Sequence, residues 1–468
     1  MMPVYNPVTA AVLEELKSLI GEKNVTVDPD KLYTYSHDEV TESRYHHLPE
    51  VVVFPETTEQ VAAIVKLANR ELIPVTPRGA GTGLACGAVP NFGGIVLSTE
   101  KMNKILEINA ASMYMVAEAG ARTEDVQQTA KKHGLLYAGD PCSGDSCFIG
   151  GNVATNAGGN KAVKYGTTRH QVYSVEIVTP KGDITTLGAR LNKSSTGYNL
   201  DQLIIGSEGT LGIITKVTLK LVPLPQHAAD FLAVFPSPGA AIDFVGIMTK
   251  AGITPTTVEF MDTVAIKCSE AFINENLPHS DGNYLIIQIE ADSEEKLEDI
   301  AVQLDELCSE NGATTLLMLN DSAKIWRARK SFAEAVRHET LIHSNEDIVV
   351  PIDKLPEAMQ RMAGVCEKYG AAARTVSHAG DGNIHLSILQ GGVPAEEWAD
   401  ILHKIQHEIF DFIYPLGGKL SGEHGIGYKK KELMQTYTDP VELEMMRSIK
   451  KALDPNWILN PDKLFDPS

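Results

Sequence analysis

Two histidines and a later Glu-His pair are the residues of this chain best suited to metal chemistry. His378 and His385 flank a turn signal in the sequence VSHAGDGNIHLSI. A hairpin at this turn would fold the chain back and bring both imidazoles to one point. Glu423 and His424 follow in the glycine-rich sequence GEHGIG. Two imidazoles and one carboxylate suit zinc, manganese or ferrous iron and leave coordination positions open for a substrate.

Spacing alone leaves the nature of this site open. The chain has 14 histidines, and a lone histidine is more often a surface or hydrogen-bonded residue than a ligand. Asn383, in the turn between the two histidines, is suited to supporting a substrate or a ligand, although asparagine is also a common turn residue. The same set of side chains around a bound water also fits a metal hydrolase.

Two glycine-rich loops predict a cofactor that carries phosphate. The first is PRGAGTGLACG, which starts at Pro77, and the second is PCSGDSCFIGGNVATNAGG, which starts at Pro141. Successive glycines let backbone N–H groups point into one concavity, which suits a pyrophosphate. One such loop is equally well a surface turn, but two predict a large, flat, phosphorylated cofactor. Neither matches the phosphate loop of nucleotidases or the Rossmann spacing, so both of those folds are disfavoured.

Strands and helices must position these residues. Apolar residues at helical spacing predict a helix over 10–20, and a capping pattern formed by Thr57 and Gln60 predicts a second helix after a strand at 51–54. Two closely spaced prolines in the run 221–225 predict a domain boundary, since they spoil a central strand. Further strands are predicted at 73–76, 95–97, 175–178, 211–214 and 284–289, and a further helix at 293–311.

Composition excludes several classes of function. The 468 residues carry 61 acidic and 41 basic side chains, so the net charge of -20 opposes binding to nucleic acid. The first residues show no signal pattern, and no apolar run reaches the length of a membrane span, so we expect a cytoplasmic protein without a membrane span. The six cysteines are scattered, which argues against both a disulfide framework and an iron–sulfur cluster.

The runs PRGAGTGL, IGGNVATNAGG and IIGSEGTLGIIT resemble the FAD-binding domain of the vanillyl-alcohol oxidase/p-cresol methylhydroxylase family. Within that family, nearly the whole chain is similar to the branch of D-lactate dehydrogenases and glycolate oxidase flavin subunits. The resemblance implies an α+β fold with a two-part FAD-binding domain and an inserted α/β cap domain. The expected segments are a helical segment at 1–45, the FAD-binding domain at 46–225, the cap with substrate and metal residues at 226–419, and a segment at 420–468 that returns to the FAD domain.

The resemblance also implies how FAD binds. Some members attach the flavin through a histidine in the first loop, where this chain has Thr82 and Leu84, so we expect noncovalent FAD. Cys86 stands where glycine is common, and its effect on the flavin is open. The implied cofactor residues are Pro77, Arg78, Gly79, Ala80, Gly81, Thr82, Gly83, Leu84, Pro141, Ser143, Ser146, Gly150, Gly151, Asn152, Thr155, Asn156, Gly158, Gly159, Gly209, Gly212, Ile214 and Asn460.

The same branch implies roles for the residues of the proposed metal site. Residues matching His378, His385 and Glu423 bind one divalent metal, and the residue matching His424 is the general base. Oxidising a 2-hydroxy acid removes a hydride from C2 and a proton from a weakly acidic hydroxyl. A metal lowers the pKa of that hydroxyl, and a neutral histidine can take its proton.

A substrate carboxylate calls for arginine, which binds it through two parallel hydrogen bonds. Arg329, in the sequence IWRARKSF, matches a substrate-binding arginine of the branch. From the sequence alone, both Arg329 and the nearby Arg327 fit solvated helix residues better than substrate ligands. Arg374 is a weaker candidate, and Asn383 is retained as a candidate substrate contact.

We therefore expect an FAD-dependent D-2-hydroxy-acid dehydrogenase that acts on D-lactate or, as the second choice, glycolate. A metal hydrolase and a noncatalytic flavin subunit are the alternatives from other classes. Because the cysteines are scattered, electrons must leave the flavin for a separate acceptor, and a protein partner is attractive: an electron-transferring flavoprotein, with coupling to NAD and ferredoxin, or an iron–sulfur subunit. Oxygen and quinone remain open as acceptors.

Overall fold

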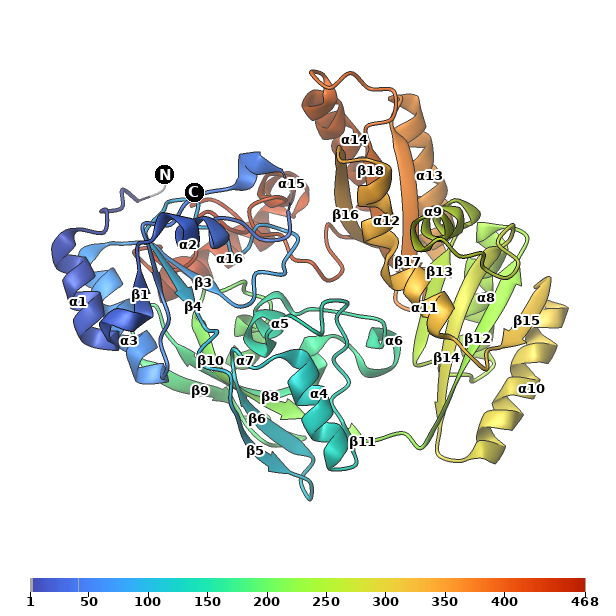
Figure 1. Cartoon of the computed structure of the whole chain (residues 1–468), viewed down its shortest axis with the longest axis horizontal. Coiled ribbons are helices and arrows are strands. Elements are labelled where there is room, and N and C mark those ends of the chain that lie inside the picture. Colours follow the sequence, from blue (N-terminus) through green and yellow to red (C-terminus); the bar gives the residue numbers. More distant parts are fainter. Residues whose placement is uncertain (1–2, 41, 468) are drawn as a thin grey trace. The chain divides into compact units, whose positions relative to one another are not determined.

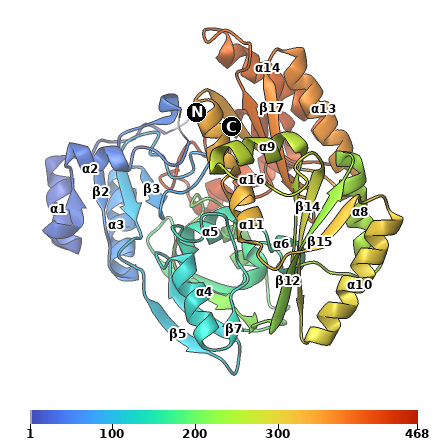
Figure 2. The ribbon, with the colours of Figure 1, turned by 45° about the vertical axis from the view of Figure 1, so that its right-hand side comes forward.

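The computed structural model describes residues 3–40 and 42–467. Residues 1, 2, 41 and 468 lie outside this description. Residues 1 and 468 are the outer ends of the expected segments 1–45 and 420–468, and residues 1 and 2 begin the stretch in which a signal pattern was sought. The chain forms two compact units, which Figure 1 and Figure 2 show from two sides. The first consists of Met1–Gly158, Gly166–Leu224 and Glu423–Ser468, and the second of Gly159–Tyr165 and Pro225–Gly422.

A four-stranded sheet and two helices form the first layer of the first unit. The strand order is β1-β2-β4-β3, in which β2, β4 and β3 run parallel and β1 runs antiparallel to β2. The threonine before α3 caps it as predicted, because its hydroxyl accepts a hydrogen bond from the backbone N–H of Gln60. The elements are α1 (Ala10–Ile20), η1 (Glu22–Asn24), β1 (Val25–Thr26), α2 (Pro29–Thr34), η2 (Ser43–Tyr45), β2 (Val51–Val53), α3 (Thr58–Glu71), β3 (Val75–Arg78) and β4 (Ile95–Ser98).

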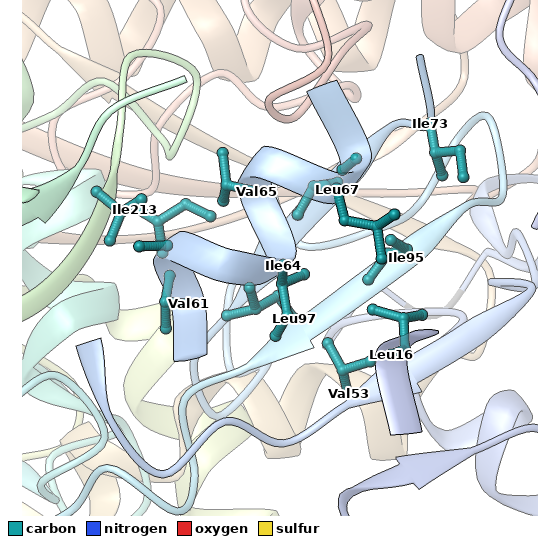
Figure 3. Packing of buried hydrophobic residues seen from close by; sticks show 14 of the residues in the cluster. Leu16, Val53, Val61, Ile64, Val65, Leu67, Ile73, Ile95, Leu97 and Ile213 are labelled. Atoms are coloured by element: carbon teal, nitrogen blue, oxygen red, sulfur yellow. The ribbon is translucent and has the colours of Figure 1, made fainter. Parts of the chain in front are cut away.

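The core of this layer lies between the sheet and the two helices α1 and α3. Leu16 of α1 and Ile64 and Leu67 of α3 are fully or almost fully buried against Val53 and Leu97 of the strands (Figure 3). The predicted helix over 10–20 is confirmed with those bounds. Burial of these aliphatic side chains fixes the strand ends from which the first glycine-rich loop departs.

A second, antiparallel sheet carries the other two glycine-rich runs. Its strand order is β5-β6-β10-β8-β9. The second loop leads into α5 and the third run leads into β10, so both emerge next to this sheet. The elements are β5 (Ile105–Asn109), β6 (Tyr114–Glu118), α4 (Thr123–Lys132), β7 (Leu135–Leu136), α5 (Ile149–Thr155), η3 (Thr168–Gln171), β8 (Val172–Val178), β9 (Ile184–Gly188), α7 (Leu200–Ile204), β10 (Ile213–Lys220) and β11 (Val222–Pro223).

The last part of the chain returns to the first sheet. After α15 (Lys431–Tyr437) and α16 (Pro440–Leu453), the chain runs beside β3. The backbone N–H of Val75 donates to the carbonyl of Ile458 at 2.7 Å, and the N–H of Asn460 donates back to the carbonyl of Val75 at 2.8 Å. The carboxyl-terminal segment therefore extends the edge of the sheet that carries the first loop.

The second unit is built on one antiparallel sheet of seven strands. The strand order is β15-β12-β14-β13-β17-β18-β16. Contacts place α8, α10 and α13 over one face, and α9, α11 and α12 over the other. The elements are α6 (Ala162–Tyr165), β12 (His227–Phe235), α8 (Pro238–Lys250), β13 (Thr257–Met261), α9 (Thr263–Ile273), β14 (Asn283–Ala291), α10 (Glu294–Glu310), β15 (Thr315–Met318), α11 (Ala323–Lys330), α12 (Phe332–Glu339), β16 (His343–Val349), η4 (Ile352–Lys354), α13 (Leu355–Lys368), β17 (Ala372–His378), β18 (Asn383–Leu389) and α14 (Trp398–Ile413).

One short segment belongs to the second unit although it lies far from the rest in sequence. Residues 159–165 contain α6, which packs on β13. Lys164 donates to the carboxylate of Glu290 at 2.9 Å, and the hydroxyl of Tyr165 donates to the same carboxylate at 2.7 Å. These contacts fasten α6 to the strand β14.

Candidate active site

The three glycine-rich runs line one pocket in the first unit. Glu423 and His424 also belong to its lining. The implied cofactor residues in the lining are Pro77, Arg78, Gly79, Ala80, Gly81, Thr82, Gly83, Leu84, Pro141, Ser143, Gly150, Gly151, Asn152, Thr155, Gly158, Gly209, Gly212 and Ile214. The structure thus gathers segments from across the first unit around one cavity whose lining is rich in glycine.

Four of the implied cofactor residues do not line this pocket. Ser146 donates its hydroxyl to a neighbouring backbone carbonyl, and Gly159 is the first residue of the segment that belongs to the second unit. Asn156 caps α5 with a φ of 53°, and its side-chain oxygen accepts two hydrogen bonds. The amide of Asn460 donates to backbone carbonyls of two loops that line the pocket. In this structure Asn156 and Asn460 hold loops in place.

Close packing explains two of the glycines in the lining. A methyl group at Gly150 would lie 2.6 Å from the Cβ of Ala119, so a larger residue would push α5 away from β6. Gly81 has a φ of 80°, a conformation that side chains with a Cβ rarely adopt. A residue larger than glycine is therefore disfavoured at both positions of the pocket wall.

Cys86 packs into the protein and does not line the pocket. Its side chain is fully buried and lies in a small apolar cluster with Val40 and Val89. Burial raises the pKa of the thiol. An uncharged, buried thiol is a poor nucleophile, so Cys86 has a packing role here.

A buried carboxylate holds the loop that carries Glu423 and His424. The two oxygens of Glu208 accept hydrogen bonds from the backbone N–H groups of Ile426 and Gly427, both at 2.8 Å. Burial raises the pKa of Glu208, while those two N–H groups oppose the rise. Sequence reasoning missed Glu208. The available signal was its place as the only charged residue in the run IIGSEGTLGIIT.

Glu423 and His424 lie next to each other at the pocket. The Nε2 atom of His424 is 3.7 Å from Oε1 of Glu423, and the two side chains are 21% and 12% exposed. The carboxylate of Glu423 also packs against Gly158 of the second loop, where a methyl group would lie 2.9 Å from its Cβ. An acid and an imidazole therefore border the cavity that the glycine-rich loops enclose.

In the second unit, the predicted hairpin brings His378 and His385 together. β17 and β18 are adjacent antiparallel strands, with His378 opposite Asn383 and His385 opposite Val376. The two imidazole rings are 4.9 Å apart between centroids and nearly perpendicular, at 86°. The expectation that a hairpin brings both rings close is confirmed.

His378 is part of a buried network of charged groups. Its Nδ1 lies 2.7 Å from Oε1 of Glu259, and the other carboxylate oxygen lies 2.6 Å from the guanidinium of Arg329. Burial alone would raise the pKa of Glu259, but His378 and Arg329 outweigh it and hold that pKa below its usual value. Sequence reasoning missed Glu259 as well. It lies 119 positions before His378 in the sequence, and the pairing of β13 with β17 brings the two together.

Asn383 has structural partners in the second unit. Its amide donates to Oδ1 of Asp347 at 2.6 Å and to the carbonyl of Ile348 at 3.1 Å. The other oxygen of Asp347 accepts a hydrogen bond from the hydroxyl of Ser421 at 2.6 Å. Asn383 thus joins the hairpin turn to β16 and to the segment that precedes Glu423.

The three candidate arginines differ in environment. Arg329 is 6% exposed, whereas Arg327 pairs on the surface with Glu275 and Arg374 pairs with Glu339. Within the described residues, the Nε of Arg329 has no hydrogen-bond acceptor. Of the three, Arg329 alone is buried beside His378.

Comparison with known proteins identifies the family. A family model described as FAD binding domain matches residues 49–188, and one described as FAD linked oxidases, C-terminal domain, matches residues 224–464. The chain belongs to the FAD-linked oxidase family. It is an FAD-dependent oxidoreductase, which confirms the resemblance seen in the glycine-rich runs and removes the metal hydrolase as an alternative.

Similar members of the FAD-linked oxidase family carry names that differ in substrate. The chain is 37% identical to a D-lactate dehydrogenase of Anaerostipes hadrus, with 98% of both chains covered. It is 33% identical to a D-2-hydroxyglutarate dehydrogenase of Stutzerimonas stutzeri, covering 97% of this chain and 99% of that one. It is 32% identical to the glycolate oxidase subunit GlcD of Bacillus subtilis, covering 98% of this chain and 97% of that one.

Solved structures confirm the fold expected for this FAD-linked oxidase. p-Cresol methylhydroxylase with substrate bound superimposes with a TM-score of 0.81 at 19% identity, covering 97% of this chain and 96% of that one. The 4-ethylphenol oxidase of Gulosibacter chungangensis gives a TM-score of 0.79 at 17% identity, with 99% of both chains covered. Among the described helices, none combines the length and apolar character needed to cross a membrane.

Proposed function

We propose that this FAD-linked oxidoreductase oxidises D-lactate to pyruvate with the help of one divalent metal. The observation that carries the proposal is the position of Glu423 and His424 on the wall of the glycine-lined pocket, together with the D-lactate dehydrogenase named among the similar proteins. Glycolate is the second candidate substrate, supported by the similarity to GlcD.

The pocket of the first unit fits noncovalent FAD. Glycine and other small residues make up much of its lining, and Gly150 is too closely packed against Ala119 for a side chain. Thr82 and Leu84 line the pocket where some relatives attach the flavin to a histidine. When bound, the flavin supplies a two-electron acceptor for the hydride that leaves C2 of the hydroxy acid.

We assign His378, His385 and Glu423 as ligands of a zinc, manganese or ferrous ion. The donor set fits such an ion, because two imidazoles on adjacent strands and one carboxylate leave positions open for substrate oxygens. When bound, the ion supplies Lewis acidity that makes the substrate hydroxyl easier to deprotonate.

The side chains of this chain then divide the remaining work. His424 takes the hydroxyl proton on a ring nitrogen as the hydride departs from C2. Arg329 binds the substrate carboxylate, supported by its burial and by the Nε that lacks an acceptor among the described residues. Asn383 acts through Asp347 to hold the hairpin turn, and in this proposal it also contacts the substrate.

We propose a protein as the acceptor of the electrons that the flavin would take up when bound. The six cysteines of the sequence form no cluster-binding pattern, which favours an acceptor on another chain. An electron-transferring flavoprotein, with coupling to NAD and ferredoxin, is the first candidate, and an iron–sulfur subunit is the second. Copurification of the untagged protein from its native cells tests this step, and a solitary chain that reoxidises rapidly in air would contradict it.

Anaerobic reduction of the bound flavin tests the proposed reaction. The purified protein is mixed with D-lactate, L-lactate, glycolate or D-2-hydroxyglutarate while the visible flavin band is followed. We expect D-lactate to bleach the band fastest, and dialysis against a chelator to slow the bleaching until metal is restored. Faster bleaching by another acid would reassign the substrate, and a band that none of the acids bleaches would point to a noncatalytic flavin subunit.

A further inference from the structure

We infer that Glu259 is a positioning residue that orients a metal ligand and the substrate arginine at once. The inference rests on the proposed function, because it assigns Glu259 a role through His378 and Arg329. Glu259 does not line the pocket of the first unit, and neither do its two ion-pair partners, His378 and Arg329.

The position of Glu259 in the sheet makes it a fixed anchor. It lies on β13, directly opposite His378 of β17, and its side chain is fully buried. β13 is the central strand of the seven, so its backbone is held by neighbours on both sides. A carboxylate on a rigid central strand has little freedom to move, and neither do the groups bound to it.

One carboxylate oxygen determines the tautomer of His378. Oε1 of Glu259 lies 2.7 Å from Nδ1 of His378. An ionised carboxylate can only accept hydrogen bonds, so Nδ1 must carry the proton. The lone pair of the ring is then on Nε2, which points away from Glu259. Such a carboxylate behind a ligating histidine fixes the ring and raises its basicity as a ligand.

The other oxygen holds Arg329. Oε2 of Glu259 lies 2.6 Å from the Nη2 of Arg329, and both side chains are buried. The pair is electrically balanced, which makes a buried guanidinium tolerable. Because Glu259 contacts only one edge of the guanidinium, the donors of its other edge remain directed elsewhere. His378 and Arg329 are therefore held in a fixed relation by one side chain.

Metal affinity tests the arm of the inference that runs through His378. The purified full-length protein, stripped of metal, is titrated with zinc or manganese as wild type and as Glu259→Gln and Glu259→Asp variants. We expect the dissociation constant to rise about 10- to 100-fold in both variants, as for other carboxylates behind metal ligands. Glu290→Gln is the matched control, since Glu290 is another buried carboxylate of the sheet whose partners lie on α6. Unchanged affinity in the Glu259 variants, with the same affinity in the control, overturns the inference.

Substrate kinetics test the arm that runs through Arg329. Glu259→Gln leaves the guanidinium without its counter-charge, so we expect the KM for the hydroxy acid to rise in addition to any loss of kcat. A merely structural role would lower the amount of folded enzyme without moving KM. A variant in which kcat falls while KM stays at the wild-type value overturns this arm.

A measurement on the wild-type protein separates this inference from the proposed function. If the protein binds no divalent metal, the metal-assisted reaction fails, but the tautomer of His378 can still be read by nuclear magnetic resonance after labelling histidine with ¹⁵N. We expect a protonated Nδ1 for the resonance that disappears in a His378→Gln variant. A proton on Nε2 instead would overturn the role of Glu259, whatever the result with metal.

A different observation leads us to propose a second cation site, on the surface of α14. His403 and His407 are four residues apart on this 16-residue helix, and their Nε2 atoms lie 3.2 Å apart. Residues at this spacing share one face of a helix. Two nitrogens bound to one tetrahedral ion at about 2.0–2.1 Å are separated by roughly 3.3 Å, so the rings already have the spacing of a chelate.

This histidine pair suits a borderline divalent cation such as nickel, copper or zinc. Imidazole nitrogens bind these ions more strongly than magnesium or calcium, and copper is expected to bind most tightly. Isothermal titration of the untagged protein with nickel alone tests the site. We expect one class of bound nickel to disappear in His403→Gln and in His407→Gln and to persist in His279→Gln, a control at an exposed histidine of the same unit. Identical isotherms for all variants overturn the site. The metal titrations of the Glu259 variants are best carried out in the His403→Gln background, which removes this second site.

Discussion

The carboxylate of Glu208 and the backbone N–H of Gly427 form a hydrogen bond of 2.8 Å that joins the third glycine-rich run to the loop carrying Glu423 and His424. The N–H of Ile426 donates to the other oxygen of the same carboxylate. A carboxylate is the side chain suited to this place, because two donors converge on two acceptor oxygens.

Replacing Glu208 tests how far this contact positions the loop. In Glu208→Gln an amide NH₂ must face one of the two N–H groups, which leaves donors opposed in a buried place. We expect the free energy of unfolding to fall by about 1–3 kcal/mol, measured by denaturant titration, and the rate of flavin reduction to fall as His424 loses its position. Glu176→Gln, at a partly buried carboxylate on β8 that is not part of the pocket lining, is the comparison. Equal reduction rates in both variants would show that the loop carrying Glu423 and His424 keeps its conformation without the hydrogen bonds to Glu208.

Replacing His424 tests its role as the base. His424→Ala is expected to keep FAD bound, because the cofactor pocket has many other contacts, and to reduce the flavin about 10²- to 10⁴-fold more slowly. Stopped-flow reduction by D-lactate measures this rate, and the absorbance of the purified protein measures FAD content. His133→Ala removes an exposed histidine at the end of α4 and serves as the control. A variant that reduces its flavin at the wild-type rate excludes His424 as the base.

Two arginines of α11 provide a matched pair for substrate binding. Arg329→Met removes the buried guanidinium, and we expect kcat/KM for the hydroxy acid to fall about 10- to 100-fold, in keeping with the loss of charged hydrogen bonds. Arg327→Met removes an exposed guanidinium two residues earlier, whose partner is Glu275, and is expected to change kcat/KM little. Steady-state kinetics decide the matter, and equal losses in the two variants would speak against a substrate contact.

A buried lysine stabilises the return of the carboxyl-terminal segment. The ammonium group of Lys450 donates to Oδ2 of Asp454 and to the carbonyl of Thr210, both at 2.6 Å, and to the carbonyl of Leu459 at 2.9 Å. Lys450→Met leaves a buried carboxylate without its partner, so we expect a loss of about 3–5 kcal/mol in the free energy of unfolding. The double variant with Asp454→Leu should recover part of this loss. If the double variant is less stable than Lys450→Met, the cost does not come from the unpaired charge.

Asp38 makes stability depend on pH in a predictable direction. Burial raises the pKa of Asp38 from 3.8 to about 6 in the folded protein. The folded state therefore holds the proton more tightly than the unfolded chain, and this contribution is present below pH 3.8 and lost as pH rises through about 6. Asp38→Asn cannot titrate, so its stability relative to wild type should increase across that window by up to about 3 kcal/mol. Denaturant titrations at both ends of the window measure the difference, and a constant difference would contradict the assignment.

Local sequence patterns correctly predicted several elements of both units. The apolar spacing around Leu16 gave the bounds of α1, and the pairing of Thr57 with Gln60 marked the start of α3, because both signals lie within a few residues of each other. The hairpin between His378 and His385 was predicted for the same reason. The glycine-rich loops predicted a cofactor site, and in the structure they line one pocket.

Long-range partners were beyond the reach of the sequence. Glu259 and Glu208 each contact residues more than a hundred positions away, through strand pairing in one case and loop packing in the other. Glu208 stood out only as the one charged residue of its glycine-rich run, and Glu259 resembles the other carboxylates of a chain that has 61 acidic residues. Arg329 likewise differed from Arg327 only by resemblance, because the burial of one and exposure of the other depend on how α11 packs on the sheet.

Residues 159–165 belong to the second unit although the chain on both sides of them belongs to the first, and this limits how the protein can be divided into fragments. A fragment cut at Pro225 and Gly422 would lack α6, and with it both Lys164 and Tyr165. Glu290 would then keep its charge without the ammonium and hydroxyl that now solvate it. Expression of the second unit as an independent protein would therefore require grafting α6 back onto the strand it covers, for instance through a short linker, and the flavin-binding part would need a bridge across the gap left behind.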